Sequence, residues 1–418
     1  MIDGWKIMEN NTKRTKGRWI LTCFIIPTVP FAERWNINMR ILHVCAQEPA
    51  FNSGGSLCVY QSHYALTKLY EDVDYAGPAI SNKDIECKYK KRYYLDASIS
   101  KLTKAITLLQ LQFDRYYPNW KNANIPLDQY DLIYVEFTKM NYVVKDIAVS
   151  GFKGKIILRA HNVERDFYRI ELENDRSLLR FMKYKLGGGR ERYMTQKADR
   201  VLAITEIDGQ RFIDIYQIPK EKIVVFPVGV NEAKHQKEIT GELNEKIRCL
   251  ITGSLWFGPN CEGVKWFIEK VWPLVKEICN LTLAGASPLE EIKKLCQKEN
   301  IHLVESPKSM MPYFENTDMV LVPIFDGGGM KVKIAEAMSY GLPVVTTSHG
   351  VIGYAIENGV DGYVTDDPLA FAEAIKTYFN MNDDDRKKIL ENERKLYRDN
   401  YSLEAIERDV HEIIASLE

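Results

Sequence analysis

Short apolar, β-branched runs alternate with longer amphipathic stretches from Met39 to the end of the chain. This alternation is typical of parallel strands joined by helices. In the first half, the expected strands are 40–45, 131–136, 155–159, 200–204 and 222–226. In the second half, they are 248–252, 281–285, 302–305, 319–323 and 343–346. The pattern therefore predicts an α/β protein.

The strand series restarts after residues 231–245, a polar stretch without an apolar period, which we interpret as a linker. A chain of 418 residues is also long for a single core. We predict two facing Rossmann-like domains, 39–230 and 246–385, each with a doubly wound parallel sheet. Ligands of such sheets bind at the carboxyl ends of the strands, so an interdomain cleft is the expected site.

Helices are expected over 386–418, and the last of them has apolar residues at helical spacing from Leu403 to Leu417. Ser402 is its predicted N-cap. We expect this helix to pack back toward the N-terminal domain.

Folding is expected to begin near Met39, so residues 1–38 are expected to be a mobile extension or to result from an upstream start, with a surface-binding arm as the alternative. The apolar run 19–32 follows four basic residues, like the start of a signal peptide. Pro27 and Pro30 interrupt it, and it is shorter than the ~20 apolar residues that span a bilayer.

The charge balance, 56 Lys and Arg against 57 Asp and Glu, argues against nucleic acid as a partner. Basic and aromatic residues gather locally at 88–94 and 176–192. These stretches are candidates for peripheral contact with an anionic membrane, and a solvated basic helix face is the alternative.

The eight cysteines include no C-x-x-C pair, which indicates buried thiols and a reducing, cytoplasmic compartment. The sequence also contains no H-E-x-x-H motif and no clustered Asp pair. No metal site is therefore expected.

The segment 323–345 carries the strongest candidate chemistry. An expected strand runs into Gly327-Gly328-Gly329, and a helix follows that ends at Gly341. Glycines let the backbone approach a ligand, and a helix start favours an anion such as a diphosphate. Lys333 and Glu336 lie on nearly the same face of this helix. A nucleotide site would use that cation and that carboxylate; a plain glycine turn with a solvated Lys–Glu pair is the alternative.

This segment, Gly-Gly-Gly-Met-Lys-Val-Lys-Ile-Ala-Glu-Ala-Met before Gly-Leu-Pro-Val-Val, resembles the retaining glycosyltransferases of family 4. Those enzymes have the GT-B fold. The resemblance covers most of 39–418, with further matching segments in the same order: Gly54-Gly55, 159–164 (Arg-Ala-His-Asn-Val-Glu), 198–205, 253–260, 350–353 and 359–363.

The resemblance implies roles for particular residues. Glu336 would bind the donor ribose, and His161 would lie near the transferred sugar. Gly54 and Gly55 would approach the leaving diphosphate or the acceptor, with a simple tight turn as the alternative. The remaining donor-binding candidates are Gly253, Ser254, Gly327, Gly328, Gly329, Met330 and Lys331.

The chain departs from the family in two places. Many members carry two glutamates separated by seven residues, and the first of these positions is Gly328 here; Asp326 is the candidate replacement. Many members also have an Arg and a Lys in the loop that corresponds to 253–260, where this chain has neither. Lys333 and Lys331 are then the nearest candidates for neutralising the leaving phosphate.

The expected activity is the transfer of a sugar from a nucleotide-diphosphate sugar to a glycan or lipid-linked acceptor, with retention of anomeric configuration. The donor is a co-substrate, and neither a cofactor nor a metal is expected. One alternative is a nucleotide-sugar-binding or scaffold protein that has lost catalysis, motivated by Gly328. A GT-B sugar epimerase is another. A dehydrogenase is disfavoured because neither half has G-x-G-x-x-G after its first strand.

Overall fold

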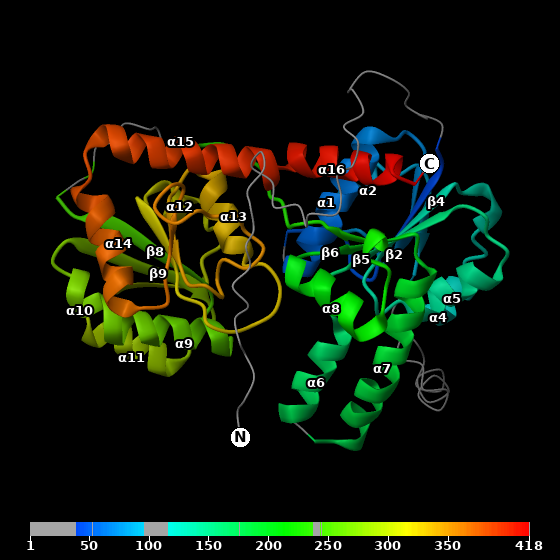
Figure 1. Cartoon of the computed structure of the whole chain (residues 1–418), viewed down its shortest axis with the longest axis horizontal. Coiled ribbons are helices and arrows are strands. Elements are labelled where there is room, and N and C mark those ends of the chain that lie inside the picture. The colour runs from blue at the N-terminus through cyan, green and yellow to red at the C-terminus, as the bar shows by residue number, and fades with distance from the viewer. Residues whose placement is uncertain are drawn as a thin grey trace.

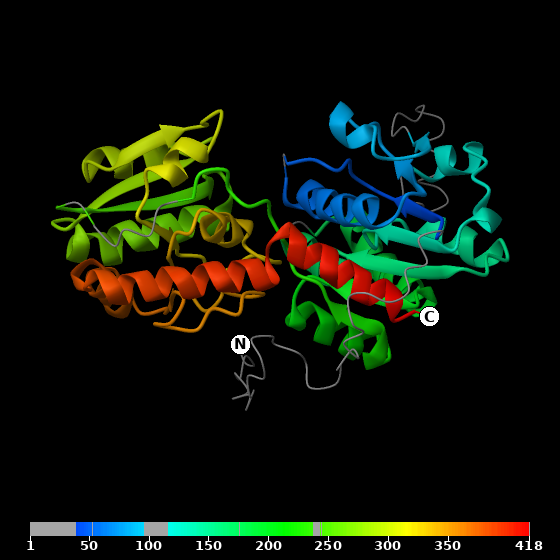
Figure 2. The same ribbon diagram turned by 90° about the horizontal axis from the view of Figure 1, so that it is seen from above.

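The computed structural model describes residues 39–51, 53–95, 116–174, 176–236, 243 and 245–417. The predicted N-terminal extension and most of 237–244 lie outside the described residues. Figures 1 and 2 show two lobes side by side, each a sheet covered by helices. This arrangement confirms the predicted α/β fold with two Rossmann-like domains.

The first domain contains a seven-stranded parallel sheet in the order β3-β2-β1-β4-β5-β6-β7. Its strands are β1 Ile41–Val44, β2 Val73–Gly77, β3 Arg92–Tyr94, β4 Leu132–Glu136, β5 Lys155–Ala160, β6 Arg200–Ala203 and β7 Ile223–Val225. Its helices are α1 Gly54–Leu69, α2 Lys83–Glu86, α4 Tyr117–Asn122, α5 Asn141–Val149, α6 Glu164–Asn174, α7 Leu178–Lys197 and α8 Glu206–Tyr216. The central strands are buried on both faces, as expected of a sheet with helices on each side.

The second domain contains a six-stranded parallel sheet in the order β10-β9-β8-β11-β12-β13. Its strands are β8 Ile247–Ser254, β9 Cys279–Ala286, β10 His302–Glu305, β11 Met319–Val322, β12 Val344–Thr346 and β13 Tyr363–Val364. Its helices are α9 Gly258–Trp266, α10 Trp272–Val275, α11 Glu290–Lys298, α12 Met311–Glu315, α13 Val332–Ser339 and α14 Pro368–Asn380.

Two helices at the C-terminus join the domains. Helix α15, Asp383–Asn400, lies along the second domain, and α16, Leu403–Ala415, continues to the first, where it packs against α1 (Figures 1 and 2). The predicted N-cap is confirmed, because Ser402 Oγ accepts a hydrogen bond from the Ala405 N–H at 3.1 Å. Ile406, Val410 and Ile413 belong to the hydrophobic core of the first sheet. The end of the chain thus completes the first domain.

The basic stretch 88–94 is partly a strand. It contains β3, and its alternate tyrosines Tyr89 and Tyr93 are buried in the first core while its lysines are exposed. Helical periodicity is absent here, so this stretch is an edge of the sheet with a charged outer side.

The cysteine prediction fails at one position. Cys87 is exposed, because it caps the single-turn helix α2 at the surface. The other described cysteines are buried, and none of them is in a disulfide. Within the described residues, no helix combines the length and the apolar character needed to cross a membrane.

Candidate active site

A cavity of about 460 Å³ lies between the domains. The first domain contributes the start of α1 and the segments that follow β4 and β5; the second contributes the loop between β11 and α13. Six of the residues singled out from the sequence line it: Gly54, Gly55, His161, Gly328, Gly329 and Met330. The cavity lies at the carboxyl ends of the strands and has the size of a small-molecule site.

Helix α1 points its N-terminus at this cavity. Ser53 caps the helix by accepting from the Ser56 N–H at 3.2 Å, and Gly54 and Gly55 form the first turn. A Cβ at position 55 would lie 2.5 Å from Gln47 Oε1 and 3.2 Å from Phe137 Cζ, so a larger residue there would displace the Gln47 side chain. The first amides of a helix have no partner within it, and they carry its positive partial charge.

The glycine loop of the second domain faces α1 across the cavity. Gly327 and Gly329 have φ of +99° and +68°, which favour glycine. The Gly327 carbonyl oxygen lies 2.7 Å from both Lys331 Nζ and His349 Nε2. Among the described residues, the N–H groups of Gly328 and Gly329 have no acceptor. The loop therefore offers the cavity unpaired donors.

Two lysines lie behind the loop, not in the cavity wall. Lys331 Nζ also donates to the carbonyls of Gly328 and Gly329, at 3.3 and 2.9 Å. Lys333 Nζ donates to the Thr252 carbonyl at 2.6 Å and to Asn260 Oδ1 at 3.0 Å. Burial lowers the pKa of each lysine to about 8.

Lys333 also explains Gly253 at the end of β8. A Cβ on Gly253 would lie 2.7 Å from Lys333 Nζ, and its φ of +148° disfavours other residues. The neighbouring Ser254 carbonyl accepts from Asn260 Nδ2 at 2.9 Å. Gly253 and Ser254 thus help to seat the lysine and do not line the cavity.

The two candidate carboxylates of the second domain differ in their surroundings. Burial raises the pKa of Glu336, while nearby Lys333 opposes the change, and no described group donates a hydrogen bond to its side chain. Asp326 is exposed, and its Oδ1 accepts from the Gly327 N–H at 2.7 Å. Neither Glu336 nor Asp326 lines the cavity. Gly328 does line it, but glycine has no side chain that could replace a carboxylate there.

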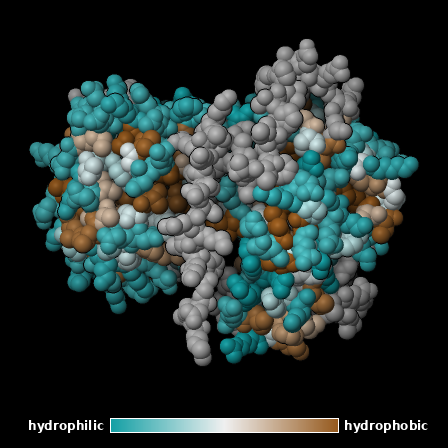
Figure 3. Space-filling view, in the orientation of Figure 1, coloured by the Kyte–Doolittle hydropathy of each residue, from teal (hydrophilic) through white to brown (hydrophobic). Residues whose placement is uncertain are grey.

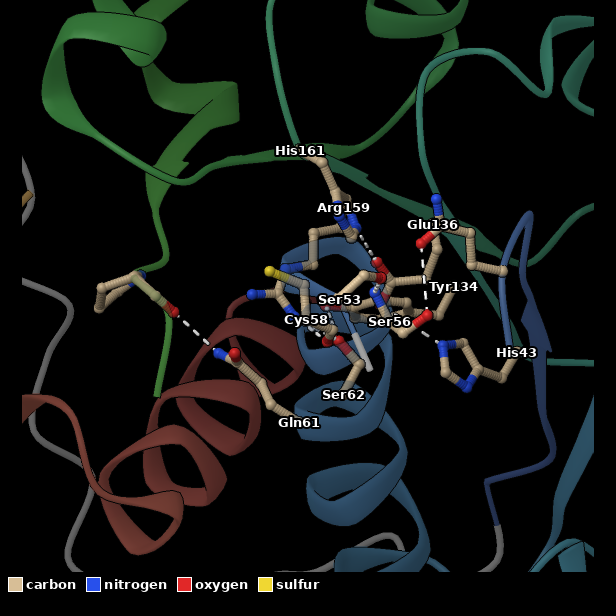
Figure 4. Close-up of polar contacts among 12 residues, drawn as sticks. His43, Ser53, Ser56, Cys58, Gln61, Ser62, Tyr134, Glu136, Arg159 and His161 are labelled. Atoms are coloured by element: carbon tan, nitrogen blue, oxygen red, sulfur yellow. Dashed lines mark hydrogen bonds and ion pairs between the residues drawn. The ribbon is translucent and has the colours of Figure 1, made fainter. Parts of the chain in front are cut away.

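His161 belongs to a buried polar network that the sequence did not reveal. Its Nε2 lies 2.5 Å from Glu136 Oε2, and its ring stacks on Phe137 at 3.7 Å. His43 Nε2 lies 3.5 Å from the other oxygen of Glu136, and His43 Nδ1 contacts the Tyr89 hydroxyl at 2.9 Å. Figure 4 shows Glu136 between the two histidines. The available signal was an acidic residue at the end of the apolar strand Leu132–Glu136.

A buried arginine lies beside this network (Figure 4). Arg159 on β5 is opposite Glu136 on β4, and its Nη1 donates to the Cys58 carbonyl at 2.6 Å and to Ser62 Oγ at 2.8 Å. Burial acts to raise the pKa of Glu136, but the two histidines and Arg159 outweigh it and hold that pKa well below its usual value. Glu136 is therefore ionised.

Met330 connects the glycine loop to the first domain. Its sulfur accepts a hydrogen bond from the Val228 N–H at 3.2 Å. A Cβ on Gly353, where φ is +89°, would lie 2.4 Å from Met330 Cγ, so the methionine needs glycine there. The loop position depends on both domains.

The second domain matches a known protein family. Residues 246–380 match the model of the family Glycosyl transferases group 1. The second domain thus matches the glycosyltransferases of group 1. The cavity-lining loop Gly328–Met330 lies within the matched range, as do Lys333 and Glu336.

The similarity to other proteins extends beyond residues 246–380. An uncharacterized 44.6 kDa protein in the cps region of Klebsiella pneumoniae is 25% identical over 288 residues, which cover 65% of this chain and 71% of that protein. HepE of Anabaena, solved with UDP and glucose, is 15% identical with a TM-score of 0.61, covering 90% of this chain and 100% of that one. Sucrose-phosphate synthase of Thermosynechococcus elongatus is 15% identical with a TM-score of 0.66, over 90% and 99%. The two domains together have the GT-B fold.

Proposed function

We propose that this protein transfers a sugar from a nucleoside diphosphate sugar to a glycan or lipid-linked acceptor. The proposal rests on two pairs of backbone N–H groups, those of Gly54-Gly55 and those of Gly328-Gly329, which face one cavity from the two domains. Backbone amides at helix starts and glycine loops favour phosphate oxygens. UDP-sugars are the first donors to test, because the HepE structure contains UDP and glucose.

The donor would lie mainly on the glycosyltransferase domain. Gly328 and Gly329 would donate to the diphosphate, Glu336 would bind the ribose hydroxyls, and His161 would contact the sugar. Lys331 and Lys333 would act through the electrostatic field behind the loop. Stabilisation of the leaving diphosphate counts most in the transition state, where negative charge grows on it.

We further propose retention of anomeric configuration without a bound metal. In this mechanism the bond between the sugar and the phosphate breaks while the acceptor hydroxyl attacks from the same face. A phosphate oxygen of the leaving group takes the acceptor proton. Asp326 is the candidate replacement for the glutamate that is absent at Gly328, and a movement of the loop would have to bring it to the sugar.

The acceptor would approach from the first domain. Helices α6 and α7 form a hairpin with exposed Leu178 and Phe181 near Arg176. In Figure 3, the lower end of this hairpin is partly brown, the colour of hydrophobic residues. Basic residues with exposed apolar side chains suit peripheral contact with an anionic membrane and a lipid-linked acceptor. The cps-region relative supports a role in polysaccharide biosynthesis.

The decisive test is a calorimetric titration of nucleoside diphosphates and their sugars into the wild type and Glu336→Ala. We expect specific binding that the substitution weakens at least tenfold, which corresponds to ~1.4 kcal/mol. Glu373→Ala, an exposed change on α14, is the matched control and should bind like the wild type. Well-folded protein that binds no nucleotide would refute the transferase proposal.

A scaffold protein is the second candidate, favoured by the absence of a carboxylate at Gly328. It would bind the donor without transferring the sugar or hydrolysing the donor slowly. A GT-B epimerase would instead convert the sugar without any acceptor. Product analysis with and without acceptor separates the three activities.

A further inference from the structure

The cationic side chain on the cavity wall comes from the first domain. Within the described residues, Lys139 is the one lysine or arginine that lines the cavity. Lys331 and Lys333 lie behind the glycine loop, where their ammonium groups donate to backbone carbonyl oxygens. The segment 253–260 of the second domain contains neither arginine nor lysine. Among these lysines, Lys139 is therefore the one placed to contact a ligand directly.

A buried turn between β4 and α5 presents Lys139 to the cavity. Every residue from 132 to 140 except Lys139 is buried. The Phe137 N–H donates to the Arg159 carbonyl at 2.9 Å, and the Met140 N–H donates to the Phe137 carbonyl at 3.4 Å. Phe137 has a φ of +75°, in the left-handed region, which an aromatic residue rarely adopts. Strain of this kind is concentrated at functional sites. The turn thus holds the backbone of one exposed, charged residue in place.

The ammonium group of Lys139 lies close to the N-terminus of α1. Its Nζ is 4.3 Å from the centroid of the Phe137 ring. The same ring lies beside Gly55, because a Cβ on Gly55 would be 3.2 Å from Phe137 Cζ. The first N–H groups of α1 carry the positive partial charge of the helix. Lys139 and the start of α1 therefore form a positive region on the wall of the first domain, across the cavity from the glycine loop.

The carboxylates near this region are less accessible than Lys139. In the part of the chain that the structure describes, Glu164 is the one Asp or Glu that lines the cavity, and it is 8% exposed. Glu136 is fully buried, and the charge of the neighbouring Arg159 opposes its own. A ligand in the cavity therefore meets an exposed ammonium group and backbone N–H donors, which together favour phosphate oxygens.

We propose that Lys139 binds a phosphate group in the cavity and supplies, from the first domain, the cation that the segment 253–260 lacks. The phosphate group lies between Lys139, the start of α1 and the N–H groups of Gly328 and Gly329. That this group belongs to a substrate of sugar transfer rests on the proposed function. Because Lys139 and the glycine loop belong to different domains, the bound phosphate contacts both.

Two sources of phosphate fit this position. One is the leaving diphosphate of the donor, and the other is a phosphate of a lipid-linked acceptor. Both present the same oxygen atoms to the ammonium group of Lys139. Separate titrations distinguish them, because the donor and the acceptor bind at the same time.

The first test is a calorimetric titration of UDP, and of uridine, which has no phosphate, into the wild type and Lys139→Met. For the leaving diphosphate, we expect UDP affinity to fall about tenfold or more in Lys139→Met, because a hydrogen bond to a charged group is lost. Uridine affinity should change less than about twofold. Lys139→Arg keeps the charge and should bind UDP within about threefold of the wild type.

The second test uses inorganic diphosphate, titrated into free protein and into protein saturated with UDP. In the saturated protein the position of the leaving diphosphate is filled, so the probe reports a separate phosphate position. Weaker binding of inorganic diphosphate there in Lys139→Met, with unchanged UDP affinity, would assign Lys139 to the acceptor. Unchanged binding of both UDP and inorganic diphosphate in Lys139→Met would overturn the proposal.

Lys145→Met is the matched control. Lys145 is exposed on α5, close to Lys139 in the sequence, and it does not line the cavity. Its substitution removes the same charge and should leave the affinity for UDP and for inorganic diphosphate unchanged. An equal loss of affinity in Lys145→Met and Lys139→Met would show an effect of net charge and refute direct binding.

The uridine titration separates direct binding from a disturbed site. If Lys139→Met weakened uridine as much as UDP, the substitution would have altered the nucleotide site as a whole, and the proposal would fail. If folded wild type binds inorganic diphosphate but no nucleotide, the proposed function fails, and the effect of Lys139→Met on inorganic diphosphate still decides the role of Lys139. Wild type that binds neither probe would refute both proposals.

Discussion

Lys331 holds the glycine loop by donating to three consecutive loop carbonyls, which leaves the loop amides for a ligand. In Lys331→Met we expect the loop to lose this arrangement and nucleoside diphosphate affinity to fall about tenfold or more, because hydrogen bonds to a charged group contribute ~1.5–3 kcal/mol. Calorimetric titration measures this change. Lys387→Met, an exposed substitution on α15, should leave the affinity unchanged. Unaltered affinity in Lys331→Met would show that the glycines keep the loop shape alone.

The sequence predicted that the glycine loop would line the cavity, but it did not predict the direction of the two lysine side chains. Gly328 and Gly329 line the cavity, and the positive φ of Gly327 and Gly329 leaves few alternatives to glycine in this turn. The direction of a long side chain is not encoded locally. Lys333 turns toward Thr252, a residue 81 positions away, and Glu136 becomes part of the site only when β4 and β5 pair. Long-range contacts of this kind were beyond the sequence pattern.

At the scale of elements, Glu191 on α7 caps the start of α6 beside the cavity. Its carboxyl group accepts from the N–H groups of Glu164 and Arg165 at 2.9 and 3.1 Å, and from the hydroxyls of Thr138 and Tyr216 at 3.0 and 2.6 Å. Burial raises its pKa to about 7, although the hydrogen bonds oppose the shift. The native protein therefore keeps a proton that the unfolded chain releases near pH 4.5.

This proton difference predicts how stability depends on pH. Between pH 4.5 and 7 the native state of the wild type binds more protons than the unfolded state, so its unfolding free energy falls as pH rises. Relative to Glu191→Gln, which does not titrate there, the wild type should lose about 1–3 kcal/mol across this window. Urea unfolding of both proteins at several pH values measures the difference. A constant difference, or one of opposite sign, would mean that the four donors keep Glu191 ionised.

Strands with an unbroken apolar run were predictable, and short or polar strands were not. All ten expected strands are present, with ends that differ by at most two residues. Three strands were missed: β2 contains the charged residue Asp74, which is buried against Arg40 and Tyr130, while β3 and β13 have three and two residues. Such strands exist because neighbouring strands supply their hydrogen bonds and partners, so tertiary context outweighs local propensity.

At the scale of the whole molecule, the chain crosses between the domains twice. Its last helix, α16, packs onto the first domain and stabilises it. Ile413 on α16 is 2% exposed and belongs to the core of the first sheet. Ile375 on α14 is fully buried in the core of the second sheet. The two isoleucines thus form a matched pair, on helices only 38 residues apart in the sequence but in different cores.

Substitution of each isoleucine by alanine should destabilise a different domain. Loss of a buried isoleucine side chain costs about 2–5 kcal/mol, because apolar contacts are lost and a cavity remains. In Ile413→Ala we expect faster hydrogen exchange in β1 and β4, and in Ile375→Ala faster exchange in β8 and β9, because local opening follows the core that is weakened. Exchange measured by mass spectrometry on peptides from each sheet distinguishes the two patterns. If Ile413→Ala accelerated exchange only in the second sheet, α16 would stabilise the second domain instead. If both variants accelerated exchange in both sheets equally, the domains would unfold as one unit, and the crossing helices would couple them more tightly than two separate cores require.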